Sequence, residues 1–255
     1  MGEQTHAQQY WQYEYDVSSR YIAPLLENWG VELSGKSVID VGCGEGGGLC
    51  SLHDLGARCS GFDVDTDRVR VAGSMKDRRE IRFCQGNLYE AVLPFAGEQF
   101  DLVVLHDVFE HLDRKPEMLE KLKTYAKETG RILITFPPYY SAYGAHQQHL
   151  RSTYGKLPFF HLIPFAMSKI LPRMKREHPH IVEELQKLAR NRMGMRKFEH
   201  IVRGSEVKVV GKQAYLVSPN HIRFGLKPIP AGPVAEIPIL GEIVCTGVIY
   251  LLAQK

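Results

Sequence analysis

The chain has 255 residues, of which 44% are hydrophobic; this favours one large α/β domain with an elaborated insertion over two equal domains. Lys and Arg number 32 against 29 for Asp and Glu, so the charge balance alone indicates neither a nucleic-acid partner nor an acidic membrane. The cysteines are odd in number and form no C-x-x-C pair, and the polar N-terminus lacks a signal-peptide core. Both features favour reduced thiols and a cytoplasmic location.

The first half of the chain alternates helix and strand signals. Helical spacing of apolar residues, followed by Gly30, predicts N-terminal helices at about residues 8–30. Strands are expected at residues 37–42, 57–64, 80–86, 100–106 and 131–138, and helices at residues 47–56, 66–77 and 116–130, the last ending at Gly130. Repeated βα units predict a mostly parallel sheet with helices on both faces.

This alternation stops after Pro138. Roughly sixty residues, rich in aromatic, His, Met and basic side chains, precede the next strand signal at residues 206–217, which is too long for an ordinary connection. We expect an inserted helical lid or substrate-binding element at about residues 139–200. A last strand is expected within residues 241–255, and its apolar run is too short to span a bilayer. Two adjacent late strands permit an antiparallel pair.

A glycine-rich turn joins the first strand to the helix after it. Gly42, Gly44, Gly46 and Gly47 lie at the carboxyl end of the sheet, where open α/β folds bind ligands. Glycines let the backbone approach a cofactor closely, and the helix N-terminus offers unpaired N–H groups. The G-x-G-x-x-G pattern alone is shared with nicotinamide and flavin enzymes, so an NAD-dependent oxidoreductase stays open.

Two carboxylates narrow the choice of cofactor. Asp40, just before the loop, would meet a pyrophosphate unfavourably but suits an ammonium or sulfonium cation. Asp63 ends the second strand about twenty residues further on, where a carboxylate can accept hydrogen bonds from both ribose hydroxyls. Asn87 follows the third strand, where its amide can meet adenine. Together they favour a cationic adenosine cofactor.

The motifs VIDVGCGEGG, GFDVD, QGNL and FDLVVLHDVFEHL resemble the successive motifs of class I S-adenosylmethionine-dependent methyltransferases, especially the small-molecule type 11 group. The resemblance covers residues 10–138, about half of the chain. It implies S-adenosylmethionine as cofactor and a single methyltransferase domain over residues 1–255. It also implies a Rossmann-like α/β fold with a seven-stranded, mostly parallel sheet, helices on both faces and a helical insertion after the fifth strand.

The resemblance also assigns roles to residues. The loop and Asp40 would hold the methionine part, Asp63 the ribose, and Val64 the adenine face; Asn87 and Leu88 would meet the adenine edge, and His106 would flank the methionine. The implied cofactor-binding residues are Asp40, Gly42, Cys43, Gly44, Gly46, Asp63, Val64, Asn87, Leu88 and His106. The family more often has Asp at position 87, but Asn still accepts a hydrogen bond through its carbonyl oxygen.

Catalytic candidates follow the fourth and fifth strands. Methyl transfer is an in-line displacement, so holding and shielding the reactants supplies much of the acceleration, and a base is needed only if the nucleophile carries a proton. His111, His146 and His149 are the candidate bases, and Tyr140 or its neighbour Tyr139 could orient the acceptor. The alternative is that the histidines only begin a helix or bond backbone carbonyls.

A metal site is a further alternative. Asp107, Glu110 and His111 have the i, i+3, i+4 spacing of one helical face, which His146 or His149 could complete. The pattern is similar to the E-x-x-E-H ligands of small-RNA 2′-O-methyltransferases and some quinone O-methyltransferases. Metal-free relatives also carry the E-H pair, so the sequence commits to no metal, although a divalent ion would lower the pKa of an acceptor oxygen.

Residues 158–176 join an apolar half to a basic half, and residues 187–197 add positive charge. The first segment predicts either an interfacial helix or lid over a lipophilic acceptor, with weak membrane-surface contact, or a core-packing helix with a solvated basic tail. We expect methylation of oxygen or nitrogen on a small or lipophilic metabolite. The basic residues would favour a metabolite that carries an anionic group. An RNA 2′-O-methyltransferase remains an alternative, although the charge balance predicts no nucleic-acid partner.

Overall fold

The computed structural model describes residues 5–164, 166–173 and 177–255, and they form one eight-stranded sheet in the order β3-β2-β1-β4-β5-β8-β6-β7. The strands are β1 (Ser37–Val41), β2 (Arg58–Asp63), β3 (Arg82–Gln85), β4 (Phe100–His106), β5 (Ala126–Phe136), β6 (Val207–Val217), β7 (Ile229–Pro230) and β8 (Gly247–Gln254). Strands β1 to β5 pair in parallel, whereas β8 is antiparallel to both β5 and β6. The Rossmann-like α/β fold is confirmed. The expected seven strands become eight because the short β7 pairs with the edge of β6.

The central strands are buried on both faces. Ile39 and Val103 belong to one hydrophobic cluster, and Val38 and Leu102, their chain neighbours, belong to another. Side chains alternate along a strand, so the two clusters lie on opposite faces of the sheet. Covering both faces explains the continuous apolar runs of these strands. Because both faces are covered by apolar side chains, polar side chains that contact a ligand are expected at the carboxyl ends of the strands.

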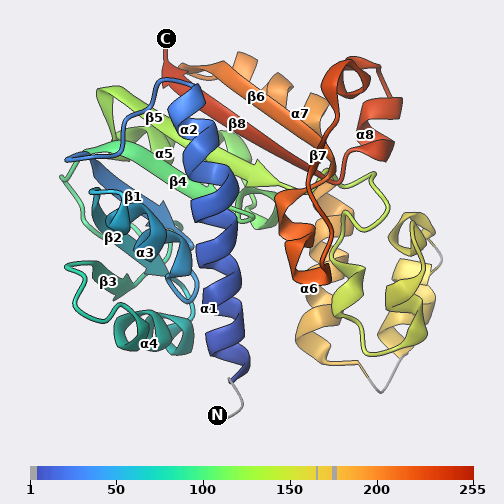
Figure 1. Ribbon diagram of the computed structural model, residues 1–255. Helices are drawn as coiled ribbons and strands as arrows, with labels where there is room; N and C mark the ends of the chain where they lie inside the picture. The colour runs from blue at the N-terminus through green and yellow to red at the C-terminus, as the bar shows by residue number, and fades with distance from the viewer. Residues whose placement is uncertain (1–4, 165, 174–176) are drawn as a thin grey trace.

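The helices are α1 (His6–Val17), α2 (Ala23–Asn28), α3 (Gly47–Asp54), α4 (Thr66–Met75), α5 (Lys115–Tyr125), α6 (Pro179–Asn191), α7 (Met195–Arg203) and α8 (Leu240–Val244). Thr5 and Gln8 form a capping box that begins α1. Figure 1 shows α1 crossing the front of the view, with α3 and α4 to its left. The first helix therefore lies over the elements that carry the glycine loop.

Two element boundaries differ from the sequence-based expectation. The helix predicted to end at Gly130 ends at Tyr125, because Ala126 already pairs with Phe100 of β4. A Cβ on Gly130 would lie 2.9 Å from the carbonyl oxygen of Phe100, so this glycine serves a close backbone approach inside a strand. The expected last strand also begins later, at Gly247, because the residues before it form α8.

Residues 139–200 contain short helical turns followed by α6 and part of α7. The sequence predicts one amphipathic helix over residues 158–176, but the structure has short helical turns there, at Phe160–Leu162, Ala166–Ile170 and Leu171–Arg173. Residues 165 and 174–176 of that prediction lie outside the described residues. The segment has its own apolar cluster, which includes Leu150 and Leu185. Within the described residues, no helix has the length and hydropathy to cross a membrane. The role of residues 139–200 as a lid stays a prediction.

The contact between α1 and α3 depends on Gly47. A Cβ there would lie 2.0 Å from the backbone oxygen of Trp11, so Gly47→Ala should displace α1 and lower the free energy of unfolding by about 1–3 kcal/mol. Gly73→Ala is the matched control, because an added Cβ there meets nothing within 4 Å. Alanine at that exposed helical position should stabilise by about 0.5–1 kcal/mol. Urea unfolding measures both, and equal effects would contradict the packing argument.

Candidate functional site

The glycine loop combines positive φ angles with close packing. Gly42, Gly44 and Gly46 have φ angles of 85°, 55° and 82°, in the left-handed region that favours glycine. A Cβ on Gly42 would also lie 2.5 Å from Cγ2 of Val108, which sequence reasoning did not connect with the loop. The loop glycines therefore let neighbouring side chains, such as Val108, approach the backbone closely at the ends of β1 and β4.

Asp40 lies near the end of β1, beneath this loop, and is 6% exposed. Its Oδ1 atom is buried and has no hydrogen-bond partner among the described residues. Burial, and then the nearby Asp63 carboxylate, raise the pKa of Asp40 to about 7, which Arg68 opposes. A buried carboxylate oxygen without a partner is costly, so this geometry suits a ligand that brings positive charge or a hydrogen-bond donor.

Asp63 joins β2 to the glycine loop. Its Oδ2 accepts a hydrogen bond from the Gly44 N–H at 3.0 Å, and its Oδ1 accepts one from the Asp65 N–H at 2.9 Å. Val64 is 60% exposed beside it and offers an apolar face. The structure thus brings Asp40, the loop and Asp63 to one edge of the sheet, as the sequence predicts, while their ligand stays a prediction.

Sequence reasoning missed a charged network above the loop. Glu14 of α1 accepts a hydrogen bond from the Gly47 N–H at 3.0 Å. Arg68 of α4 donates to Glu45 from Nε and Nη2 at 2.9 and 2.6 Å, and its Nη2 lies 3.5 Å from Glu14. Burial, and then Glu45, raise the pKa of Glu14 well above its ordinary value. The available signal was an acidic residue inside the aromatic run YWQYEY.

Four residues implied to bind the cofactor have structural partners of their own. Asn87 accepts a hydrogen bond from the Tyr89 N–H at 3.0 Å, which closes a turn, and Leu88 lies in the core. Cys43 is also buried, and burial raises the pKa of its thiol well above the ordinary value. His106 Nε2 lies 3.3 Å from Oδ1 of Asn220. Their cofactor roles remain predictions.

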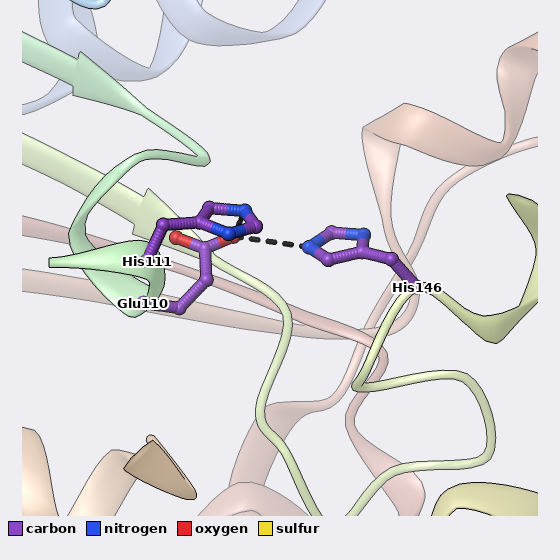
Figure 2. A group of neighbouring side chains, drawn as sticks. All are labelled: Glu110, His111 and His146. Atoms are coloured by element: carbon purple, nitrogen blue, oxygen red, sulfur yellow. Dashed lines mark hydrogen bonds and ion pairs between the residues drawn. The ribbon is translucent and has the colours of Figure 1, made fainter. Parts of the chain in front are cut away.

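A second cluster gathers Glu110 and three histidines. Figure 2 shows Glu110 and His111, from the turn Phe109–His111 after β4, facing His146. Glu110 Oε1 lies 3.3 Å from His146 Nε2 and 3.7 Å from His111 Nε2. The ring of His146 stacks between those of His111 and His149, with centroid distances of 5.2 and 5.7 Å. The structure therefore brings the three candidate bases together.

The pKa values of these four groups are shifted in different directions. Burial raises the pKa of Glu110 to about 7, against the hydrogen bond to His146. Burial lowers the pKa of His146, but the hydrogen bond and the charge of Glu110 outweigh it and leave that pKa raised. Burial, and then His146, lower the pKa of His111 to about 3 and that of His149 to about 4. Glu110 and His146 therefore form a hydrogen-bonded acid–base pair in which both pKa values are raised.

The expected helical face through Asp107 is wrong. Asp107 has a φ angle of 54°, and the short turn Phe109–His111 replaces the helix, so the three residues do not share one face. Glu110, His111 and His146 place candidate ligand atoms within 4.8 Å of one another, and Asp107 is outside this group. Its carboxylate accepts hydrogen bonds from Thr135 Oγ1 at 2.7 Å and from the Asn220 amide. These polar groups line a small cavity whose other walls include Val17 and Ile249.

The two tyrosines after β5 lie in different environments. Tyr139 is buried, and its hydroxyl donates to the backbone oxygen of His161 at 3.3 Å, so it packs inside the insertion. Tyr140 is 39% exposed and meets the Tyr139 ring edge-on. Of the two, Tyr140 is therefore the one with surface available to an acceptor.

Comparison with known proteins places the loop inside a recognised domain. Residues 39–134 match a family model described as a methyltransferase domain. The ubiquinone biosynthesis O-methyltransferase of Stutzerimonas stutzeri is 31% identical over 51% of this chain and 58% of its own length. Phosphoethanolamine N-methyltransferase 2 of Caenorhabditis elegans is 22% identical over 58% of this chain and 36% of its own length. The chain spans about half the length of the first curated relatives it matches.

Solved structures share the fold along the whole chain. The magnesium protoporphyrin IX methyltransferase of Synechocystis with bound SAH aligns with a TM-score of 0.56 at 14% identity, covering 100% of this chain and 90% of that one. The plantazolicin methyltransferase in complex with SAH aligns with a TM-score of 0.55 at 12% identity, covering 96% and 85%. At these identities the likeness shows the fold alone.

Asp40 makes stability depend on pH. Its raised pKa, about 7 against an ordinary 3.8, means that the folded chain keeps a proton that the unfolded chain releases, so the free energy of unfolding falls as pH rises between these values. Asp40→Asn removes this contribution. Between about pH 4 and pH 8 the variant should lose about 4 kcal/mol less stability than the parent in urea unfolding. The control Asp67→Asn changes an exposed carboxylate, and an Asp40→Asn profile parallel to the parent's would contradict the assignment.

Proposed function

We propose that the protein is a class I, S-adenosylmethionine-dependent methyltransferase, since residues 39–134 match a methyltransferase-domain model. In this proposal it transfers a methyl group from S-adenosylmethionine to oxygen or nitrogen of a small or lipophilic metabolite. The observation that carries this proposal is the buried Oδ1 of Asp40 beneath the glycine loop, which finds no hydrogen-bond partner in the described part of the chain. A methyl donor with a sulfonium and an ammonium group supplies a positively charged partner for this carboxylate.

The proposed donor site extends from Asp40 along the ends of the strands. Asp63 would accept hydrogen bonds from the ribose, and the exposed side chain of Val64 would contact the adenine. The pyrophosphate of NAD would instead meet a group of carboxylates that includes Glu14 and Glu45, which is unfavourable. The electrostatics of the loop thus support a methyl donor over a nicotinamide dinucleotide.

Glu110 and His146 would act as the proton-accepting pair. As the acceptor oxygen or nitrogen attacks the methyl carbon, the carbon–sulfur bond breaks and the acceptor's proton passes to this pair. The pKa of Glu110, near 7, suits a base that works at neutral pH. His111 and His149 would stay neutral and orient His146 by ring stacking, and Tyr140 would contact the acceptor.

Two observations support a lipophilic acceptor. Leu157, Phe159 and Ile163 are exposed apolar residues of the insertion that also supplies His146. The relatives include enzymes of ubiquinone biosynthesis that methylate oxygen, as their name states. We therefore infer that the insertion serves as a lid and that the acceptor carries a hydroxyl on an apolar body.

Ligand titration tests the donor assignment. We expect the protein to bind S-adenosylhomocysteine in a calorimeter and to ignore NAD, because the loop carboxylates repel a pyrophosphate. Asp63→Asn should weaken S-adenosylhomocysteine binding about tenfold by weakening the ribose hydrogen bonds. Asp67→Asn, with a side chain that is 80% exposed, is the matched control. Tight NAD binding without a response to S-adenosylhomocysteine would overturn the proposal.

Metal removal tests the proton-accepting pair. With a panel of phenolic acceptors, kcat/KM should rise with pH through about 7, the pKa of Glu110, and EDTA should leave it unchanged because the pair needs no metal. Glu110→Gln should lower kcat about 100-fold, whereas His149→Gln, which leaves the contact between Glu110 and His146 in place, should have a smaller effect. Loss of activity with EDTA and recovery with Co²⁺ would instead assign Glu110, His111 and His146 to a metal.

A further inference from the structure

The loop site carries more negative than positive side chains. Asp40 and Asp63 lie at the strand ends, and Glu14 and Glu45 lie above them, while Arg68 is the basic side chain in ion-pair contact with this group within the described chain. Arg68 is engaged mainly with Glu45, since its contact with Glu14 is 3.5 Å against 2.6 Å. The charge of Glu14 is therefore only partly compensated.

Glu14 reaches the space directly above the loop. A Cβ on Gly44 would lie 2.4 Å from Glu14 Oε1 and 2.6 Å from Arg68 Nη2, so these two side chains occupy the volume that the glycine leaves free. The Gly47 N–H holds the other oxygen of Glu14 at the N-terminus of α3. α1 thus places a carboxylate directly against the backbone of the loop.

The buried Oδ1 of Asp40 has no partner among the described residues. This is an independent indication that the cluster of carboxylates at the loop binds a ligand. The adenosine and amino-acid parts are the same in the donor and in the product. The two molecules differ in the methyl group and in the sulfonium charge, so the donor has a net charge of one and the product none. A carboxylate in this space acts on that difference, and a cationic donor bound beside it favours the ionised form of Glu14 against the burial that raises its pKa.

We propose that Glu14 makes the site select the cationic donor S-adenosylmethionine over its uncharged product S-adenosylhomocysteine. This inference rests on the proposed function, because it assumes that the loop binds both molecules. Glu14 is a specificity-determining residue in this scheme, and Arg68 opposes it by adding a positive charge to the same space. The consequence is faster loss of the product once its sulfur has become neutral.

The test compares dissociation constants by calorimetry for S-adenosylmethionine, S-adenosylhomocysteine and sinefungin, an analogue with an ammonium group near the position of the sulfonium. In Glu14→Gln, the ratio of the S-adenosylhomocysteine constant to the S-adenosylmethionine constant should fall about tenfold, a change of about 1.4 kcal/mol. The binding of sinefungin should weaken together with that of S-adenosylmethionine, while the dissociation constant of S-adenosylhomocysteine should change little. Glu27→Gln, an exposed glutamate of α2, should leave all three constants unchanged.

Arg68→Gln changes the charge of the site in the opposite direction to Glu14→Gln. It also provides a second measurement of the ratio if the Glu14→Gln variant folds poorly. It removes a positive charge from the same space, so the ratio should rise. Ratios that stay constant in both variants, or that move in the same direction, would overturn the inference while leaving the proposed function intact. If neither the donor nor the product binds the parent protein, the proposed function itself fails.

Discussion

The close contact of α1 with α3 at Gly47 is the constraint from which the arrangement of the site follows. Only a residue without a side chain lets the Trp11 backbone approach this turn, and that approach places Glu14 over the glycine loop. The glycine-rich turn thus accommodates a helix in addition to the ligand that we propose it binds. The energetic cost of bringing several carboxylates together is offset in part by Arg68 and in part by retained protons, as the raised pKa values of Asp40 and Glu14 indicate.

The second cluster has a different origin, because its members come from segments that the sheet alone does not bring together. Glu110 and His111 follow β4, whereas His146 belongs to the insertion after β5. The Tyr139 N–H donates to the Met193 carbonyl at 2.8 Å, which ties the start of the insertion to its end. The insertion therefore supplies half of the proposed proton-accepting pair, and its packing decides whether the pair forms.

The parts of the structure that follow local patterns were predictable. Short apolar runs located β1, β2 and β4, and the positions of Asp40 and Asp63 followed from the strand ends. The start of β5 was not predictable, because pairing of Ala126 with Phe100 overrides the helical pattern. Contacts of Glu14 and Asn220 with distant residues leave no periodic signal, and the positive φ angle of Asp107 is uncommon outside glycine.

The position of β8 has a consequence for how the chain reaches this structure during synthesis. The last strand along the sequence lies between β5 and β6, so β6 lacks its main partner until residues 247–254 have left the ribosome. The parallel strands β1 to β5 can associate earlier, with the outer edge of β5 exposed. A nascent chain paused before Gly247 would present that edge to other chains, which makes this interval the one in which a chaperone has most to protect.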